Sequence, residues 1–157
     1  MNIEKVMSTK IAVSHPDDSL SAAAQLMWEH DCGSILVVDD DEALVGIITD
    51  RDICMAGYIR GRPLHTIAIS DTMSNQVFSC SAEDSLETAG QLMADNQVRR
   101  IPIVDSDSRP IGVLSLNDIA RYAASSEIGD GLDHEVAHTL AAICQPWSER
   151  RLESLSA

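Results

Sequence analysis

Two short patterns in the sequence place side chains at spacings that could serve a ligand or a metal ion. The pattern Gly-x-x-[Ser/Thr]-x-x-Asp occurs twice, at residues 46–52 and 112–118. The pattern His-Glu-x-x-His occurs once, at residues 134–138. A hydroxyl followed by a carboxylate suits a phosphorylated sugar, whereas two histidines one helical turn apart suit zinc.

In the first pattern, the hydroxyl and the carboxylate are Thr49 with Asp52 and Ser115 with Asp118. Each pair falls where a strand is expected to end and a helix to begin. A helix N-terminus offers free amide donors and a dipole that favours an anion, so a phosphate could bind there with help from the hydroxyl. The aspartate could accept hydrogen bonds from two ribose hydroxyls. The same spacing is also an ordinary helix cap, and the sequence leaves both interpretations open.

In the second pattern, His134 and His138 could bind zinc with Glu135 activating a water molecule. One amphipathic helix is expected around residues 133–144, and Pro146 should end it. No third ligand is evident, and a metal site needs at least three. The alternative is a helix, exposed to solvent or facing a dimer partner, in which the two histidines occur by accident.

Both hydroxyl–aspartate pairs belong to a longer internal repeat. Residues 6–54 align without a gap onto residues 72–120 at an offset of 72 − 6 = 66, and sixteen of the 49 aligned pairs are identical. Apolar character is kept where residues differ, as in Ile11/Val77 and Ile48/Leu114. The chain is therefore a tandem duplication.

Each half is predicted to contain a strand, a helix, two strands and a second helix, which makes a mixed α+β fold. Ser19 and Ser85 are good helix N-caps, and apolar residues at helical spacing follow each of them. Short runs rich in β-branched residues indicate the buried strands. The expected elements are 11–13, 20–30, 35–38, 45–49 and 50–57 in the first half, and 77–79, 86–96, 101–104, 111–115 and 116–124 in the second.

The repeat predicts four segments along the chain. Residues 1–58 form the first repeat, 59–71 a connection, 72–124 the second repeat and 125–157 a C-terminal helical extension. At 157 residues and 45% hydrophobic, the chain can bury a core without disulfides or metal.

The charge balance excludes some partners. Eleven Lys and Arg against 25 Asp and Glu give 11 − 25 = −14, which argues against nucleic acid or an anionic membrane as a direct partner. No stretch approaches the roughly 18 apolar residues that span a bilayer, and the start of the chain has no signal-peptide core. We therefore expect a cytoplasmic protein without membrane insertion. Its four cysteines have no CxxC pair and are expected to be reduced.

The order of these motifs resembles the cystathionine-β-synthase (CBS) domain family, whose members occur in tandem pairs called Bateman modules. The resemblance covers residues 6–124. It rests on an opening Met-Ser, an Asp-Ser-Leu helix start, an apolar strand ending in Asp, and the hydroxyl–aspartate pattern, each present twice. These residues are Val6-Met7-Ser8 and Thr72-Met73-Ser74, Asp18-Ser19-Leu20 and Asp84-Ser85-Leu86, Gly33–Asp39 and Arg99–Asp105, and the two segments 46–52 and 112–118.

The resemblance implies an adenine-nucleotide site in each of two clefts between the halves. In similar modules the hydroxyl residue reaches phosphate, the aspartate holds ribose, and adenine lies against apolar strand residues. Thr49 and Asp52, and Ser115 and Asp118, are then nucleotide-binding residues. The implied apolar linings are Ile11, Ile35 and Leu36 in one cleft and Val77, Ile101 and Pro102 in the other. The arginines available for phosphate charge are Arg51, Arg99 and Arg100.

The resemblance also implies a regulatory function without catalysis. The halves are expected to pack through their sheets about a pseudo-two-fold axis, and two modules to pair as a homodimer. The ligand would be AMP, ADP, ATP or an adenosyl compound, no cofactor would be required, and the regulated enzyme or transporter would bind in trans. Two alternatives remain: a ligand-free structural homodimer, and a small zinc protein using His134 and His138.

The two halves differ where the clefts are expected. Leu36 aligns with Pro102, Ser34 with Arg100, and Asp50-Arg51 with Leu116-Asn117. Core positions are therefore kept while ligand-facing positions have changed. We expect the two sites to differ, with at most one of them competent.

Overall fold

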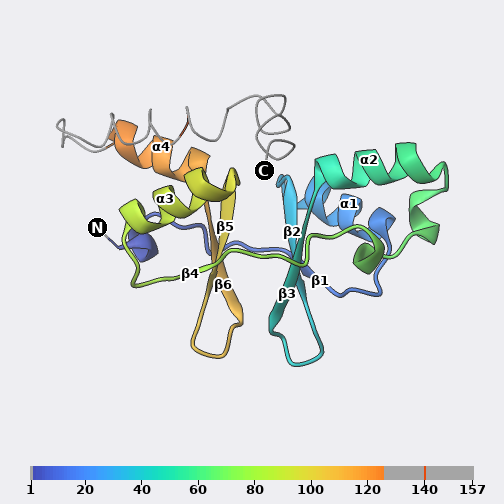
Figure 1. Ribbon diagram of the computed structural model, residues 1–157, viewed down its shortest axis with the longest axis horizontal. Coiled ribbons are helices and arrows are strands. Elements are labelled where there is room, and N and C mark those ends of the chain that lie inside the picture. The colour runs from blue at the N-terminus through green and yellow to red at the C-terminus, as the bar shows by residue number, and fades with distance from the viewer. Residues whose placement is uncertain (1, 126–139, 141–157) are drawn as a thin grey trace, which may run out of the picture. The chain divides into compact units, whose positions relative to one another are not determined.

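The computed structural model describes residues 2–125 and residue 140 of the chain (Figure 1). The expected element order, strand, helix, strand, strand, helix, is confirmed in both halves, and the fold is mixed α+β. Apart from Leu140, the expected helix at 133–144 lies outside the described residues, and so do His134 and His138. None of the described helices is long and apolar enough to cross a membrane.

The first sheet has three strands in the order β1-β2-β3. β1 pairs in parallel with β2, and β2 pairs antiparallel with β3. Alternate residues of β2, Ile35 and Val37, join a core with apolar residues of the two helices, as the period of a strand requires. The elements are β1 (Val13–Ser14), α1 (Leu20–Glu29), β2 (Ser34–Val38), β3 (Leu44–Thr49) and α2 (Asp50–Arg60).

The second half repeats this order with closely matching lengths. Its sheet is β4-β5-β6, with β4 parallel to β5. Ile101, Ile103 and Leu114 of the two longer strands are fully buried. The elements are β4 (Cys80–Ser81), α3 (Leu86–Asn96), β5 (Arg100–Val104), β6 (Pro110–Ser115) and α4 (Leu116–Ser125).

Three elements, β1, β4 and α2, differ from expectation by more than one residue. The first strand of each half starts later than predicted, at Val13 and Cys80, because only the residues opposite β2 and β5 find ladder partners. Helix α2 does not end by Gly57 but continues to Arg60. Its end is set by Gly61, which adopts the left-handed conformation (φ 58°) that glycine tolerates best.

Two short 3-10 helices make reciprocal contacts that the repeat alignment does not indicate. In η1 (Ile3–Lys5) the Ile3 amide donates to the Asp84 carbonyl at 2.9 Å. In η3 (Ile69–Asp71) the Ile69 amide donates to the Asp18 carbonyl at 2.8 Å. Both isoleucines are 0% exposed. Ile3 and Ile69 are equivalent positions at the repeat offset of 66, and so are Asp18 and Asp84. The segment that precedes each repeat therefore packs against the start of the first helix of the other repeat.

The Met-Ser segments continue this exchange. Ser8 pairs with Val113 of β6, and Ser74 pairs with Ile47 of β3, each through two backbone hydrogen bonds. Met73 lies so close to β3 that a Cβ added at Gly46 would be 2.5 Å from its Sδ atom. Met73 and Ser74, which open the second repeat in the alignment, therefore extend the strand ladder of the first repeat.

As a result, the chain divides into two compact units that do not follow the sequence repeat. Among the described residues, unit 1 contains residues 2–7, 83–101 and 114–125. Unit 2 contains residues 8–82 and 102–113. Unit 2 thus includes the whole first sheet with its helices, together with β4, most of β5 and β6, and the tip of the β5–β6 hairpin. At this tip, the Leu44 amide donates to the Ser108 carbonyl at 2.9 Å.

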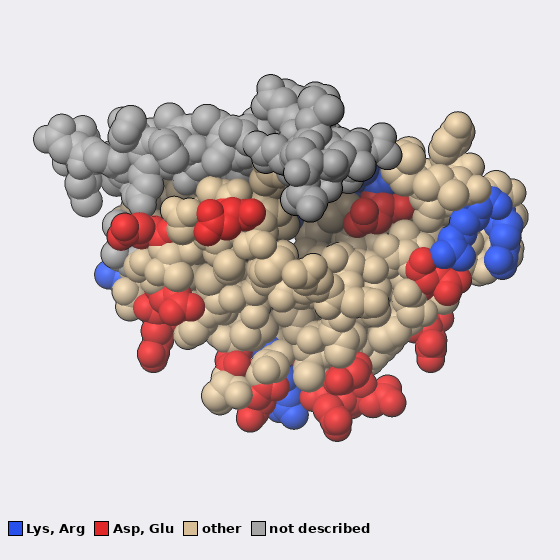
Figure 2. Space-filling model, viewed as in Figure 1, with Lys and Arg blue, Asp and Glu red and all other residues tan. Residues whose placement is uncertain are grey.

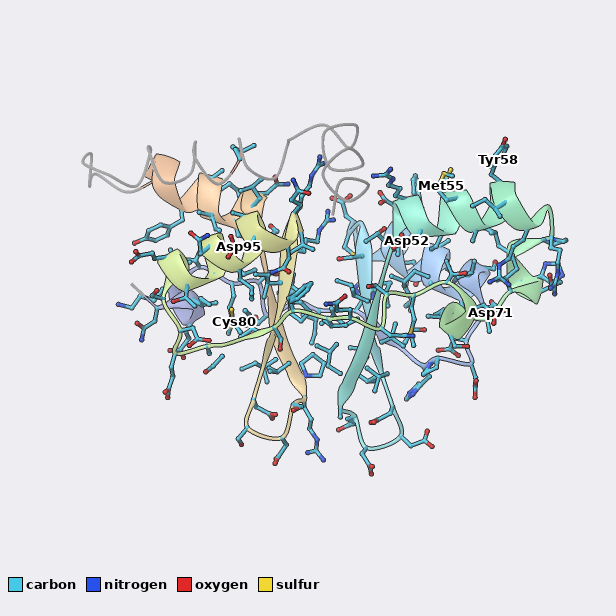
Figure 3. The ribbon with its side chains drawn as sticks, viewed as in Figure 1. Asp52, Met55, Tyr58, Asp71, Cys80 and Asp95 are labelled. Carbon is cyan, nitrogen blue, oxygen red and sulfur yellow. The ribbon has the colours of Figure 1, made fainter. Side chains whose placement is uncertain are left out.

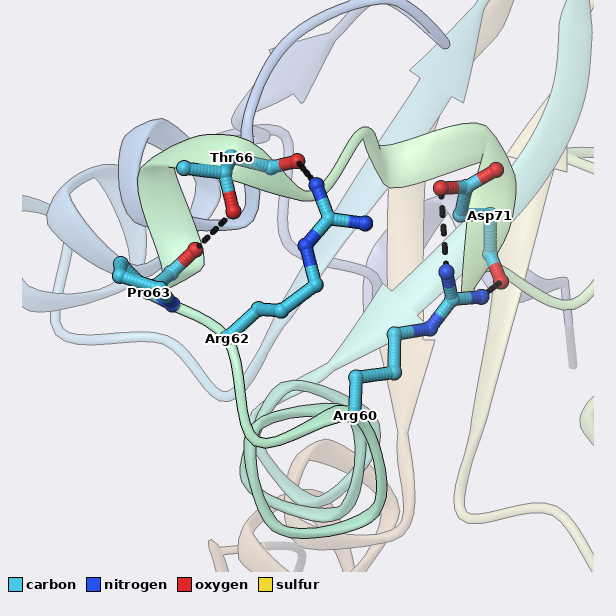
Figure 4. A network of polar contacts seen from close by, with 5 residues as sticks. All are labelled: Arg60, Arg62, Pro63, Thr66 and Asp71. Atoms are coloured by element: carbon cyan, nitrogen blue, oxygen red, sulfur yellow. Dashed lines mark hydrogen bonds and ion pairs between the residues drawn. The ribbon is translucent and has the colours of Figure 1, made fainter.

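The connection after α2 is fixed by two arginines (Figure 4). Arg60 Nη1 lies 3.2 Å from Asp71 Oδ2, and Arg60 Nη2 donates to the Asp71 carbonyl at 2.6 Å. Arg62 Nη2 donates to the Thr66 carbonyl at 2.7 Å, at the end of η2 (Leu64–Thr66). The C-terminal end of α2 is therefore tied to the segment that leads to Ile69.

We expect Ile3→Ala and Ile69→Ala each to lower the free energy of unfolding by about 2–5 kcal/mol, because each removes a fully buried side chain. Urea unfolding measures this effect. Trp28→Ala is the control, since Trp28 is 89% exposed and its truncation should change stability by about 0.5 kcal/mol or less. Equal effects at all three positions would contradict the exchanged packing.

Asp18 stabilises the turn before α1. Its Oδ2 atom accepts from the Ser14 hydroxyl at 2.6 Å and from the His15 amide at 2.8 Å. The backbone bond from His15 is the main cause that lowers the pKa of Asp18, followed by the bond from the buried Ser14 hydroxyl. Both bonds favour the carboxylate over the carboxylic acid.

Asp18→Asn should therefore destabilise the protein at neutral pH and have less effect in acid. Because the folded-state pKa of Asp18 is below its unfolded value, the contribution of Asp18 is fully present above the unfolded pKa. It is lost as the pH falls through the folded pKa. Urea unfolding of the wild type and the variant between pH 7 and pH 3 measures the convergence. Asp17→Asn controls for net charge, and a difference that stays constant down to pH 3 would disprove the assignment.

Candidate functional site

Thr49 and Asp52 form a reciprocal pair where β3 leads into α2. Asp52 Oδ2 accepts from the Thr49 amide at 2.9 Å and from the Thr49 hydroxyl at 2.7 Å. The Asp52 amide donates back to Thr49 Oγ1 at 3.3 Å. This is a capping box, and Thr49 is the N-cap of α2. Figure 3 labels Asp52 at the first turn of this helix.

Ser115 and Asp118 form the same arrangement where β6 leads into α4. The Ser115 amide donates to Asp118 Oδ2 at 2.9 Å, and the Ser115 hydroxyl donates to the same oxygen. The Asp118 amide donates to Ser115 Oγ at 3.2 Å. Asp118 is only 8% exposed, whereas Asp52 is half-buried. The helix-cap interpretation of both pairs is therefore correct, whatever else the pairs bind.

The outer carboxylate oxygens of the two aspartates differ. Arg121 Nη2 donates to Asp118 Oδ1 and forms an ion pair with it one turn along α4. In the part of the chain that the structure describes, Oδ1 of Asp52 accepts no hydrogen bond, and Met55 stands at the repeat position of Arg121. Arg121 is not among the site residues predicted from the sequence, although the spacing Asp-x-x-Arg on a helix is a signal that could have identified it.

The start of each helix is fixed against the loop before the sheet's middle strand. The Asp50 amide donates to the Gly33 carbonyl at 3.3 Å, and the Leu116 amide donates to the Arg99 carbonyl at 3.0 Å. The backbone of Arg99 is thus adjacent to the second pair, with Arg100 following in β5. In the first half, Gly33 and Ser34 occupy these positions and bring no charge.

The apolar residues expected to line the clefts take different environments. Ile35 and Ile101 are 0% exposed, and Ile35 belongs to the core cluster. Leu36 and Pro102 are buried as well, whereas Ile11 and Val77 are half-buried. Val77 and Pro102 fall in unit 2, while Ser115, Asp118 and Ile101 fall in unit 1. Within its own unit, each hydroxyl–aspartate pair is complete.

Metal-ligating side chains do not gather in the described residues. No group of three or more His, Cys, Asp or Glu residues there could hold an ion. Cys32 is half-buried, Cys54 is exposed and Cys80 is buried. Acidic side chains are spread over the face in Figure 2, including the acidic turn after β2.

The sequence and the fold match one known family. The family model for the CBS domain matches twice, at residues 3–58 and 69–125. The chain belongs to the CBS domain family and carries the domain as a tandem pair. It is 36% identical over 137 residues to the CBS domain-containing protein YhcV of Bacillus subtilis. The aligned region covers 87% of this chain and 96% of the relative.

Solved CBS structures resemble this fold, and three of them contain bound ligands or metal ions. CBSX2 in complex with AMP has a TM-score of 0.68 and 26% identity, over 78% of this chain and 96% of its own. The CBS domain pair of protein MJ0100 with 5-methylthioadenosine and S-adenosyl-L-methionine has a TM-score of 0.71 and 24% identity, over 78% of this chain and 98% of that chain. Hypoxic Response Protein I with two coordinated zinc ions has a TM-score of 0.69 and 30% identity, over 78% and 98%.

Proposed function

We propose that this protein is a cytoplasmic regulatory module without catalytic activity that binds an adenine nucleotide or adenosyl compound at Thr49–Asp52, Ser115–Asp118 or both. The observation that carries the proposal is the duplicated hydroxyl–carboxylate pair at a strand-to-helix junction. Such a junction offers amide donors for a phosphate and, one turn away, a carboxylate for ribose hydroxyls. AMP, the ligand of CBSX2, contains both a phosphate and ribose hydroxyls, whereas the two ligands of the MJ0100 pair contain ribose hydroxyls and no phosphate.

The capping role and the binding role are compatible. Each carboxylate uses Oδ2 for the cap, so Oδ1 is the oxygen that faces a ligand. The hydroxyl protons of Thr49 and Ser115 are bonded to the carboxylates, and a bound phosphate would compete for them. The apolar linings around Ile11, Ile35 and Leu36, and around Val77, Ile101 and Pro102, remain predictions, as does the phosphate role of Arg51, Arg99 and Arg100.

Regulation would operate by a shift in population between two arrangements of the module. A ligand changes the equilibrium only to the extent that it binds one arrangement more tightly than the other. The output would then require a partner, an enzyme or transporter, that recognises one arrangement.

If the proposal is correct, AMP at 100 times its Kd should stabilise the fold by about 2.7 kcal/mol, which corresponds to a rise in Tm of about 5–10 °C. The double variant Asp52→Asn/Asp118→Asn should lose this rise. An Asn amide oxygen can still accept from the cap amide, so the variant should stay folded. Differential scanning fluorimetry with AMP, ADP, ATP, S-adenosylmethionine and 5-methylthioadenosine measures the shifts.

The matched control is Asp40→Asn/Asp107→Asn, which removes two carboxylates from exposed hairpin turns and should keep the full shift. A wild-type protein whose Tm does not move with any of these compounds at millimolar concentration would refute nucleotide binding. The ligand-free structural homodimer would then be the better interpretation.

The expected homodimer has a suitable surface on α2. Met55, Tyr58 and Ile59 follow helical spacing, and Tyr58 and Ile59 are 82% and 72% exposed. Figure 3 shows Met55 and Tyr58 pointing away from the sheet that α2 covers. Apolar side chains exposed together on one helix face are typical of a protein interface. We propose that a second copy of the chain covers this face.

Ile59→Lys should accordingly convert a dimer into a monomer, because the interface would have to bury a lysine charge without a partner. The molecular mass measured by light scattering after size exclusion should fall from twice the chain mass of 17.0 kDa to 17.0 kDa. Ser21→Lys adds the same charge to an exposed position of α1 and should leave the mass unchanged. A wild-type protein that is already monomeric at high concentration would disprove the dimer.

The zinc alternative keeps one supporting observation, the two zinc ions of Hypoxic Response Protein I. In this chain the candidates are His134 and His138, which lie outside the described residues. Metal analysis of the purified protein before and after chelation separates this function from nucleotide binding.

A further inference from the structure

The two hydroxyl–aspartate pairs have opposite electrostatic surroundings. The charged residues next to Thr49 are Asp50, Arg51 and Asp52, which sum to 1 − 2 = −1. Those next to Ser115 are Arg99, Arg100, Asp118 and Arg121, which sum to 3 − 1 = +2. Three of the eleven basic residues in a chain of net charge −14 thus belong to unit 1, with Arg99 and Arg100 at the start of β5 and Arg121 in α4.

At α2, the protein supplies its own anion to the helix N-terminus. The exposed Asp50 carboxylate accepts from the Arg51 amide at 2.8 Å through Oδ1. An amide donor that a phosphate would use is therefore occupied, and the helix carries two acids in its first turn. A phosphate at this position meets both competition and repulsion.

At α4, the corresponding residues favour an anion. Leu116 replaces Asp50 and is buried, so no carboxylate competes for the amide of Asn117 among the described residues. Arg99 is held next to the helix start by its carbonyl bond from the Leu116 amide. The first turn of α4 contains one acid, Asp118, whose charge is already paired with Arg121.

Arg121 also sets a condition on the ribose. Ribose hydroxyls that bind Asp118 Oδ1 must displace the Arg121 guanidinium from it. Arg121 is 77% exposed and free to swing to a new partner, and a phosphate provides that partner whereas an uncharged nucleoside does not. At Asp52, Oδ1 accepts no bond within the described residues, so a ribose displaces nothing there.

We propose that the two sites divide adenine compounds by charge. The Asp118 site takes phosphorylated nucleotides such as AMP, and the Asp52 site takes uncharged or cationic adenosyl compounds. This inference rests on the proposed function, since it assumes that the two pairs hold ribose and phosphate. It assigns each half its own class of ligand, in place of one competent and one inactive site.

Adenosine and AMP are the matched probes because they differ only in the phosphate. In the Asp52→Asn protein, which keeps the Asp118 site, calorimetry should give AMP a Kd about tenfold or more below that of adenosine. Each exposed charge changes the affinity by a factor of about 1.4 to 5, and the two sites differ by three charges. In the Asp118→Asn protein, adenosine should bind at least as tightly as AMP.

Two further substitutions test the named residues. Arg121→Met introduces the residue found at the repeat position in α2 and, in the Asp52→Asn background, should reduce the preference for AMP over adenosine severalfold. Asp50→Asn, in the Asp118→Asn background, should tighten AMP binding severalfold and leave adenosine binding unchanged. Added salt should weaken AMP at the Asp118 site more than adenosine at the Asp52 site.

The outcomes separate the inference from the function on which it rests. If both single-site proteins bind with the same ratio of adenosine to AMP affinity, or if Arg121→Met leaves that ratio unchanged, the division by charge is wrong and nucleotide binding stands. If the wild type binds neither adenosine nor AMP, the proposed function fails and the inference fails with it.

Discussion

The fold depends on an exchange of lead segments between the two repeats. Ile3 is fully buried beside the helix start of the second repeat, and Ile69 is fully buried beside that of the first. Neither repeat can complete its core from its own contiguous residues, because a few essential apolar side chains come from the segment that precedes the other repeat. The sequence repeats reflect how the chain arose by duplication. The compact units show which residues pack together, and their boundaries differ from those of the repeats.

Local patterns predicted the helices and longer strands well, and long-range pairing was harder to predict. The start of α1 at Leu20 and the extent of α3 follow from Ser19, Ser85 and apolar spacing, which act within a few residues. The position of β1 depends instead on which residues meet β2, more than twenty positions away. The exchange of Ile3 and Ile69 also left no local signal, since a buried isoleucine looks the same in sequence whichever core it joins.

The candidate site was predictable in its main chemistry but not in its detail. Hydroxyl and aspartate at a spacing of three form a cap by geometry alone, so Thr49–Asp52 and Ser115–Asp118 could be identified without a structure. The sequence also predicted that the two sites differ, but it could not show which carboxylate oxygen each hydrogen bond uses. Arg121 donates to the outer oxygen of Asp118, whereas the corresponding oxygen of Asp52 accepts no hydrogen bond from any residue that the structure describes. The sites thus share a framework and differ in the charge that surrounds it.

The bond between Arg60 and Asp71 gives helix α2 a mechanical role. The helix has eleven residues and is therefore about 16 Å long. Thr49 and Asp52 lie at its N-terminal end, and Arg60, which contacts Asp71, lies at its C-terminal end. Asp71 lies two residues before Met73, which packs against Gly46 in the strand that leads back to Thr49. These contacts connect β3, α2 and the segment from Asp71 to Met73 in a ring. Helix α2 therefore cannot tilt at its N-terminal end without straining the Arg60–Asp71 contacts or moving that segment.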